Sequence, residues 1–145
     1  MVTALFDTNI LIDHMDGIKE ASAELSAYPT AVISVINWME VACDLTSEEV
    51  ADFNDLLRDS DIRVVQTSES IMVRAARLRG HTRKKLPDCV IRATAHSFGC
   101  LVVTRNPSDF GGEGPMVRVP YDLVGGKAVN VRPPAACPLF QSPRS

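Results

Sequence analysis

The sequence predicts an α/β fold in which a mostly parallel sheet of four or five strands is covered by helices on both faces. Short apolar runs alternate along the chain with segments of helical spacing, which is typical of βα units. The chain has 145 residues, of which 46% are hydrophobic and 23% charged, a size and composition suited to one compact domain. Ligands of such sheets bind at the carboxyl ends of the strands.

The first third of the chain contains two of the predicted strands. Val2–Phe6 is a short apolar run that stops at Asp7-Thr8-Asn9, a polar turn that can begin a helix. Ile18–Tyr28 has helical spacing, and the proline after it ends that helix. The β-branched run Thr30–Val35 predicts the second strand, and it leads into a helix that carries Glu40.

The alternation continues through the middle of the chain. Ser47 and the two glutamates after it begin a helix, and Ile62–Val65 is the next strand. Ser68–Arg79 follows as a helix that we expect Gly80 to close, because glycine is favoured at helix C-termini.

The last helix and two short strands complete the periodic pattern. Pro87 lies in the first turn of a helix that reaches Phe98, where Gly99 ends it. Leu101–Val103 is a continuous apolar strand, and Met116–Val119 is the last strand predicted.

The end of the chain has a different composition. After Asp122 the periodicity is lost, and Gly125 and Gly126 precede a stretch with four prolines. We therefore expect a compact domain over residues 1–125 and a Pro-rich, poorly ordered tail over residues 126–145.

Composition excludes several classes of protein. No apolar run approaches the ~20 residues that span a bilayer, and the first residues lack the basic region of a secretion signal, so we expect a cytoplasmic protein without membrane association. The net charge of −3 argues against nucleic-acid binding through overall positive charge. The four cysteines form no CxxC pair and the three histidines lack ligand spacing, so no zinc site is expected.

Four acidic residues fall where an apolar element meets a turn or a helix. Asp7 ends the first strand, and Asp109 follows the strand Leu101–Val103. Asp88 lies in the first turn of an apolar helix, and Glu40 lies within a helix among apolar neighbours. A carboxylate in such a setting is costly unless a cation compensates it. If all four converge at one end of the sheet, a hard divalent ion is required, and oxygen ligands select Mg²⁺ or Mn²⁺.

Each carboxylate also has a simpler explanation. Asp7 and Asp109 are placed to cap helices, and Asp88 is placed to interact with a helix macrodipole. Glu40 resists this explanation, because nothing near it in the sequence offers a partner.

Four segments surround the acids: Leu5-Phe6-Asp7-Thr8-Asn9-Ile10-Leu11, Ile33-Ser34-Val35-Ile36-Asn37-Trp38-Met39-Glu40-Val41, Leu86-Pro87-Asp88-Cys89-Val90-Ile91-Arg92-Ala93-Thr94-Ala95 and Thr104-Arg105-Asn106-Pro107-Ser108-Asp109-Phe110. In order and spacing they resemble the four motifs of PIN-domain ribonucleases, specifically the VapC-type toxins of type II toxin–antitoxin pairs. The resemblance implies a three-layer α/β/α fold and Mg²⁺-dependent endoribonuclease activity, usually on structured RNA. It also implies a cognate antitoxin protein as inhibitor, and a homodimer.

The resemblance assigns roles to particular residues. The acidic catalytic positions are Asp7, Glu40, Asp88 and Asp109. The polar residues that orient them are Thr8, Asn9, Thr104 and Asn106. The chemistry also fits the residue types, because a metal held by Asp7 and Asp88 can lower the pKa of a water for in-line attack on phosphorus. Glu40 and Asp109 would hold that water or a second ion.

Positive charge precedes the third motif. The segment from Ser70 to Pro87 has no acidic residue and six basic ones: Arg74, Arg77, Arg79, Arg83, Lys84 and Lys85. The last four of these are the candidate RNA-binding residues, since phosphates would approach the metal site beside them. The alternative is a solvated loop.

Two other functions are compatible with the predicted fold. The first is a catalytically silent module that binds RNA or protein, which the four retained carboxylates disfavour. The second is a flavodoxin-like phosphoacceptor or a haloacid-type phosphatase. A phosphoacceptor would place a Lys after a late strand, where Thr104 and Arg105 stand, and the phosphatase would need an Asp at the position of Asn9.

Overall fold

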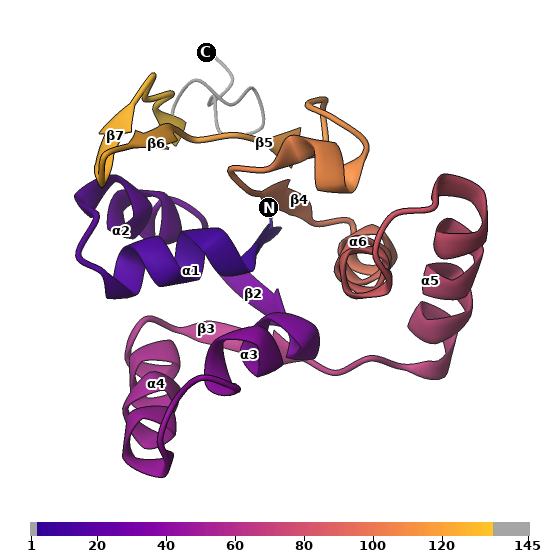
Figure 1. Cartoon of the computed structure of the whole chain (residues 1–145), viewed down its shortest axis with the longest axis horizontal. Helices are drawn as coiled ribbons and strands as arrows, with labels where there is room; N and C mark the ends of the chain where they lie inside the picture. The colour runs from indigo at the N-terminus through magenta and orange to yellow at the C-terminus, as the bar shows by residue number, and fades with distance from the viewer. Residues whose placement is uncertain (1–2, 135–145) are drawn as a thin grey trace, which may run out of the picture.

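A parallel five-stranded sheet forms the centre of the structure, a computed structural model that describes residues 3–134 (Figure 1). The strands, in chain order, are β1 (Thr3–Phe6), β2 (Thr30–Ser34), β3 (Ile62–Val65), β4 (Leu101–Val103) and β5 (Val117–Arg118). Their order across the sheet is β3-β2-β1-β4-β5, and every neighbouring pair is parallel. The predicted α/β class and mostly parallel sheet are confirmed.

Helices follow the strands in the predicted alternation. They are α1 (Thr8–Met15), α2 (Lys19–Ser26), α3 (Val35–Ala42), α4 (Ser47–Asp59), α5 (Glu69–Thr82), α6 (Leu86–Phe98) and the short 3-10 helix η1 (Pro107–Phe110). Four of them begin where a side-chain oxygen accepts a backbone N–H of the first turn, at Asp7, Ser34, Thr46 and Ser68. None of the helices in residues 3–134 combines the length and apolar character needed to cross a bilayer.

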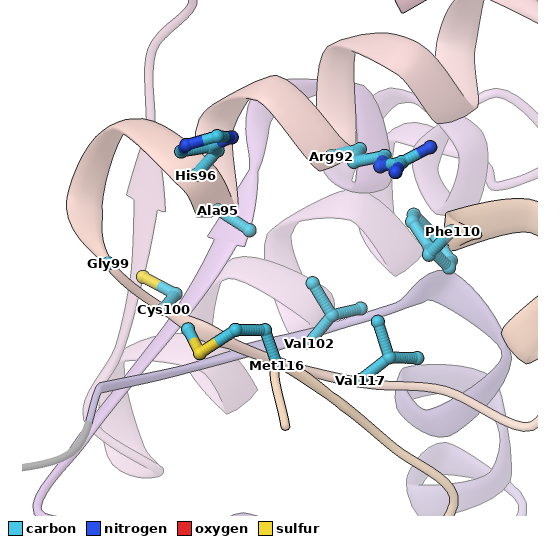
Figure 2. A pocket seen from close by; sticks show the side chains of 9 residues that line it. All are labelled: Arg92, Ala95, His96, Gly99, Cys100, Val102, Phe110, Met116 and Val117. Atoms are coloured by element: carbon cyan, nitrogen blue, oxygen red, sulfur yellow. The ribbon is translucent and has the colours of Figure 1, made fainter. Parts of the chain in front are cut away.

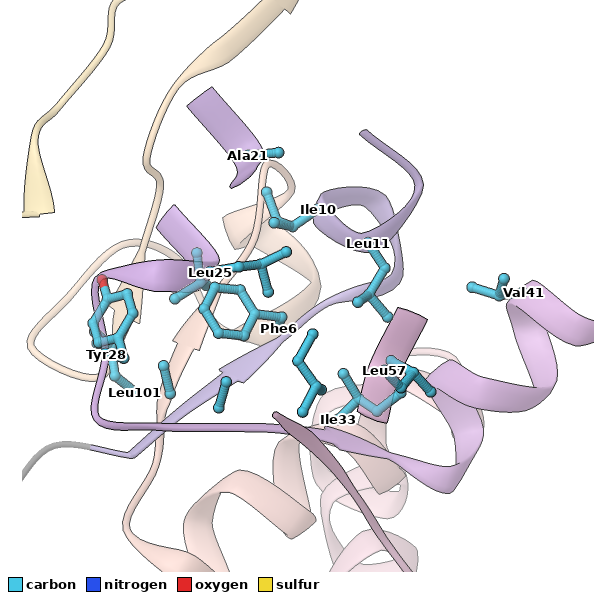
Figure 3. Close-up of a cluster of buried hydrophobic side chains, with 14 of the residues drawn as sticks. Phe6, Ile10, Leu11, Ala21, Leu25, Tyr28, Ile33, Val41, Leu57 and Leu101 are labelled. Carbon is cyan, nitrogen blue, oxygen red and sulfur yellow. The ribbon is translucent and has the colours of Figure 1, made fainter. Parts of the chain in front are cut away.

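Side chains from both faces of the sheet build the core. On one face Phe6 packs with Ile10 of α1 and Leu25 of α2 (Figure 3). On the other face Leu5 packs in a separate cluster with Ile91 of α6. Because neighbouring residues of β1 are buried on opposite faces, the strand lies between two helical layers. Only Asp7 separates its carboxyl end from the start of α1.

The chain after β5 differs from the prediction. No strand was expected after Met116–Val119, but β6 (Asp122–Val124) and β7 (Lys127–Val129) form an antiparallel two-stranded sheet. Its turn is made by Gly125 and Gly126, both at positive φ, a turn signal typical of a hairpin. Strands of three residues are too short to show periodicity. Residues 135–145, the remainder of the predicted tail, lie outside the described residues.

The end of α5 also differs. Gly80 does not close the helix, which continues through Thr82 and ends at Arg83 in the left-handed conformation, with φ 60°. The Thr82 hydroxyl donates to the Leu78 carbonyl at 2.6 Å, which occupies an acceptor of the last turn. The helix therefore ends three residues later than the predicted Arg79, and the basic segment lies at this junction with α6.

Candidate active site

One open cavity of about 320 Å³ lies where β1, β2 and β4 lead into the following helices and loop. Its lining residues are Asp7, Thr8, Asn9, Ile12, Glu40, Lys85, Pro87, Asp88, Asn106 and Asp109. The structure thus brings together all four predicted acids, although they come from four separate segments of the chain. Of the predicted orienting residues, Thr8, Asn9 and Asn106 line the cavity, and Thr104 lies directly behind Asp7.

Asp7 is the buried centre of this site, with a residue exposure of 7%. Its carboxylate accepts hydrogen bonds from the Thr8 backbone N–H at 2.8 Å and from the Thr104 hydroxyl at 2.8 Å. The Asn9 amide donates to the same carboxylate at 3.3 Å. Burial raises the pKa of Asp7, and the charges of Glu40 and Asp109 raise it further. Asp7 is therefore a buried acid whose hydrogen-bond donors are all neutral.

Thr8 connects Asp7 to Glu40 across two helices. The Thr8 hydroxyl donates to Glu40 Oε1 at 2.7 Å, and the Asn37 amide donates to that hydroxyl at 3.0 Å. Asn37 also lies 3.5 Å from Asp7 Oδ1 and is fully buried. Its own Oδ1 accepts from the Ser34 backbone N–H at 2.8 Å in a capping box.

Asn37 was not predicted as a site residue. The signal was present, because Ser34 and Asn37 have the three-residue spacing of a capping box at the start of α3. A fully buried asparagine amide in such a box must direct its remaining donors inward, and here it reaches Thr8.

Asp88 enters the cavity from the first turn of α6. Partial burial raises its pKa to about 6, and the charges of Asp109, Asp7 and Glu40 contribute to the rise, while Lys85 lowers it. All three other acids thus contribute to the raised pKa of Asp88, as expected for carboxylates that line one cavity.

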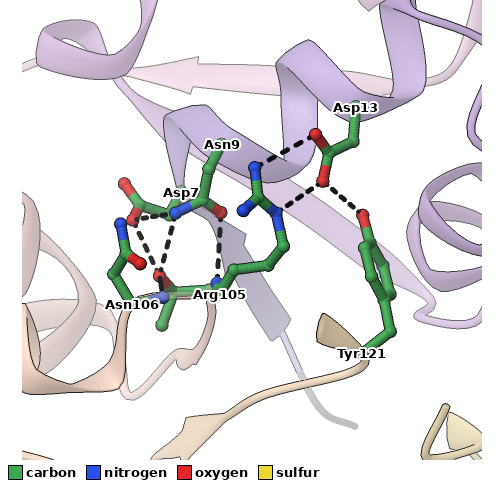
Figure 4. Close-up of polar contacts among 7 residues, drawn as sticks. Asp7, Asn9, Asp13, Arg105, Asn106 and Tyr121 are labelled. Atoms are coloured by element: carbon green, nitrogen blue, oxygen red, sulfur yellow. Dashed lines mark hydrogen bonds and ion pairs between the residues drawn. The ribbon is translucent and has the colours of Figure 1, made fainter. Parts of the chain in front are cut away.

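The loop after β4 supplies the last wall of the cavity. Thr104 is fully buried, and its hydroxyl accepts from the Asn106 backbone N–H at 2.9 Å. Asn9 holds the loop from the other side, because its Oδ1 accepts from the Arg105 backbone N–H at 3.2 Å (Figure 4). Asn106 and Asp109 of this loop face the cavity.

Of the four candidate RNA-binding residues, one lines the acidic cavity. Lys85 is exposed and lines it, next to Asp88. Arg79 is an exposed residue of α5, and Arg83 and Lys84 follow that helix; none of these three is a lining residue. Lys85 is therefore the basic residue that the structure places at the acidic site.

The donor set fits a hard divalent cation. The cavity offers carboxylate, hydroxyl and amide oxygens and no sulfur or imidazole ligand. Within residues 3–134 no three His, Cys, Asp or Glu side chains are arranged as a preformed metal cage. An ion such as Mg²⁺ needs no such cage, since it binds through one or two carboxylates and keeps several waters. Burial first, and then the neighbouring acids, raise the pKa of Asp7 and Asp88, and a bound cation would offset both effects.

A second cavity lies toward the C-terminal end of α6 (Figure 2). Its volume is about 370 Å³, and apolar side chains such as Val102 and Phe110 dominate its lining, with Arg92 and His96 at its edge. It contains no carboxylate, so the two cavities differ in chemistry as well as position.

Comparison with known proteins agrees with this geometry. Residues 4–110 match the sequence model of the PIN domain. A toxin–antitoxin complex from Klebsiella pneumoniae contains a chain with 38% sequence identity and a TM-score of 0.72, and the match covers 83% of this chain and 99% of that one. No curated protein sequence matches.

Two more distant structures share the fold. VapBC-1 from nontypeable Haemophilus influenzae has 21% identity and a TM-score of 0.63, covering 76% of this chain and 91% of that one. VapBC2 from Rickettsia felis, bound to a DNA fragment from its promoter, has 20% identity and a TM-score of 0.59, covering 73% and 89%. The resemblance drawn from the four motifs is confirmed: the chain belongs to the PIN domain family.

Proposed function

We propose that this PIN domain is a Mg²⁺-dependent endoribonuclease of the VapC type, the toxin of a toxin–antitoxin pair. The observation that carries the proposal is the single open cavity in which Asp7, Glu40, Asp88 and Asp109 meet. The raised pKa of Asp7 and Asp88 supports it, because burial and the neighbouring acids both disfavour the charged carboxylates there, and a cation would offset that charge.

In this proposal Asp7 and Asp88 hold the ion, which is Mg²⁺ or Mn²⁺. A bound ion would supply two kinds of chemistry there: it would polarise the phosphodiester and lower the pKa of a water for in-line attack on phosphorus. Glu40, whose carboxylate accepts the Thr8 hydroxyl at 2.7 Å, and Asp109 would hold that water or a second ion. Lys85 attracts the RNA phosphate to the edge of the cavity.

The partners follow from the same family relationship. We propose a cognate antitoxin protein as the inhibitor, supported by the similarity to a toxin–antitoxin complex at 38% identity. Structured RNA is the proposed substrate, because aromatic residues make up only 6% of the chain and base stacking has few platforms. A homodimer and a cytoplasmic location complete the proposal.

The decisive experiment is cleavage of purified structured RNA with Mg²⁺, with Mn²⁺ and with excess EDTA. We expect cleavage only with the metals, and products with a 5′-phosphate and a 3′-hydroxyl, since the attacking water leaves the ribose 2′-hydroxyl unused. Full activity in EDTA, or products with 2′,3′-cyclic phosphate ends, would refute the mechanism. RNA binding without cleavage under all conditions would instead favour the silent binding module.

A further inference from the structure

A buried polar network lies behind the proposed active site and outside its cavity (Figure 4). Asp13 of α1 is 3% exposed and forms a two-point ion pair with Arg105, from Nε to Oδ2 at 2.7 Å and from Nη2 to Oδ1 at 3.2 Å. The Tyr121 hydroxyl donates to Asp13 Oδ2 at 2.8 Å. None of these three residues lines the cavity of the four acids.

Arg105 connects this network to the site through its backbone. It lies between Thr104, which holds Asp7, and Asn106, which lines the cavity. Its backbone N–H donates to Asn9 Oδ1, and Asn9 in turn donates to Asp7. Because the Asn9 oxygen is occupied by Arg105, its amide nitrogen is directed at Asp7 and Thr104.

The spacing of Asn9 and Asp13 along α1 allows both side chains to contact Arg105. Asn9 and Asp13 are four positions apart and therefore lie on the same face of the helix. Asn9 contacts the backbone of Arg105, and Asp13 contacts its guanidinium. The loop that carries Asn106 and Asp109 is thus fixed to α1 at two points one helical turn apart.

Tyr121 extends the network beyond the segment that matches the PIN domain, which ends at residue 110. Its side chain is 1% exposed, and burial together with the Asp13 carboxylate raises its pKa, so the hydroxyl remains a donor. The segment between β5 and β6 therefore contributes a buried contact that bears on the loop 104–109.

We propose that Asp13, Arg105 and Tyr121 are positioning residues that set the affinity of the acidic site for its divalent ion. They act through Asn9 and Thr104, which fix the orientation of Asp7, and through the loop that carries Asp109. The inference rests on the proposed metal-dependent function. Groups that orient metal ligands without touching the ion typically change metal affinity by about 10- to 100-fold when removed.

The molecule contains a matched control. Glu24, 2% exposed, pairs with Arg118 Nε at 2.7 Å and accepts the Tyr28 hydroxyl at 3.1 Å. This group has the same composition, one acid, one arginine and one tyrosine. Its acid and tyrosine are buried like those of the first group, and its arginine side chain is 11% exposed against 25% for Arg105. None of its members lines the acidic cavity. Arg118 touches the loop after β4 through its backbone, since its carbonyl accepts from the Thr104 N–H at 3.0 Å, and side-chain substitutions leave that bond in place.

The test compares Tyr121→Phe and Arg105→Lys with Tyr28→Phe and Arg118→Lys in the full chain. Three quantities are measured: the Tm, the Mn²⁺ affinity of the RNA-free protein by titration calorimetry, and the NMR signals of the Asn9 side-chain amide. We expect similar decreases in Tm for each matched pair. Only Tyr121→Phe and Arg105→Lys should move the Asn9 signals and weaken Mn²⁺ binding, by about tenfold for the arginine variant.

The outcomes separate the two proposals. Unchanged Mn²⁺ affinity and Asn9 signals in folded Tyr121→Phe and Arg105→Lys, beside a wild type that binds Mn²⁺ and cleaves RNA, overturn the positioning role alone. Equal losses of Mn²⁺ affinity in the Tyr28→Phe and Arg118→Lys controls overturn it as well, because the effect would then be general destabilisation. A wild type that neither binds Mn²⁺ nor cleaves RNA overturns the proposed function together with this inference.

Discussion

Carboxylates are buried both in the arginine-paired groups around Asp13 and Glu24 and in the acidic cavity around Asp7, and their charge is compensated differently in the two places. Asp13 and Glu24 each accept a short ion pair from an arginine and a hydrogen bond from a tyrosine. Asp7 is almost as well buried, at 7% exposure, but the donors that reach it are neutral. Its pKa is raised by burial and by the acids around it.

The difference distinguishes acids that have an arginine partner within the protein from Asp7, which we propose as a metal ligand. A buried charge is normally paired, because desolvation costs several kcal/mol per ion. Where the chain concentrates acids without an arginine, the charge is available to an ion from outside. Burial alone would have placed Glu24 and Asp7 in one class; the nature of the donors distinguishes them.

The first prediction removes the charge of Glu24, a buried acid that is paired with an arginine. Glu24→Gln leaves the Arg118 guanidinium, whose side chain is 11% exposed, without its carboxylate. The free energy of unfolding should fall by about 3–5 kcal/mol, as for other buried pairs that lose one partner. Urea denaturation measures this loss, and the rise in Tm on adding Mn²⁺ should persist. A loss below about 1 kcal/mol, typical of exposed pairs, would show that the pair is not a structural contact of this kind.

The second prediction removes the charge of an acid in the cluster, Asp88, which has no arginine partner within residues 3–134. Asp88→Asn keeps the side-chain volume but relieves repulsion among the four acids, so the Tm in EDTA should hold or rise slightly. RNA cleavage in Mg²⁺ should fall at least about 100-fold, because a direct ligand matters at least as much as the residues that orient it. The variant should still bind the antitoxin.

An exposed acid provides the control for Asp88. Asp55, 61% exposed and paired with Arg58 on the surface of α4, should tolerate Asp55→Asn with cleavage unchanged. If Asp88 only interacts with the dipole of α6, the opposite pattern follows. Stability would then drop by about 0.3–1 kcal/mol, and cleavage would survive.

The third prediction concerns pH. The folded protein raises the pKa of Asp88 from 3.8 to about 6, so it holds that proton more tightly than the unfolded chain does. The resulting stability is fully present below pH 3.8 and is lost as the pH rises through 6. In EDTA the Tm of the wild type should therefore decrease across this window relative to that of Asp88→Asn.

Divalent ions should reverse the trend. Metal ligands must be deprotonated, so Mg²⁺ should raise the wild-type Tm more at pH 7 than at pH 5. Thermal melts of both proteins across this range, with and without Mg²⁺, supply the measurement. Superimposable curves for wild type and Asp88→Asn would mean that Asp88 is not part of a charged cluster.

The sequence predicts the fold class and the acidic cluster because both depend on local signals. A polar residue that ends an apolar strand, as Asp7 does, lies at the carboxyl edge of a parallel sheet wherever its neighbours fall. The helix starts are equally local, since Ser34 and Ser68 cap the helices that follow them.

The paired acids could not be predicted in this way. Arg105 contacts Asp13 across 92 positions and Tyr121 contacts it across 108, and no periodicity records such pairings. The end of α5 was misplaced because a glycine in a helix and a glycine that ends one are identical in sequence. Arg83, not Gly80, takes the left-handed position.

The smallest effect is expected at Lys85, the basic residue that lines the acidic cavity. Lys85→Ala should weaken RNA binding a few-fold and reduce the slope of log affinity against log salt by about 1, the value for one phosphate contact. Lys84→Ala, one position away and outside the cavity, is the matched control and should change the slope less. Because Lys85 lowers the pKa of Asp88, its removal should also shift the pH window of the Asp88-dependent melts upward. Equal salt slopes for the two variants, measured by RNA titration at several ionic strengths, would assign the positive charge to a solvated loop.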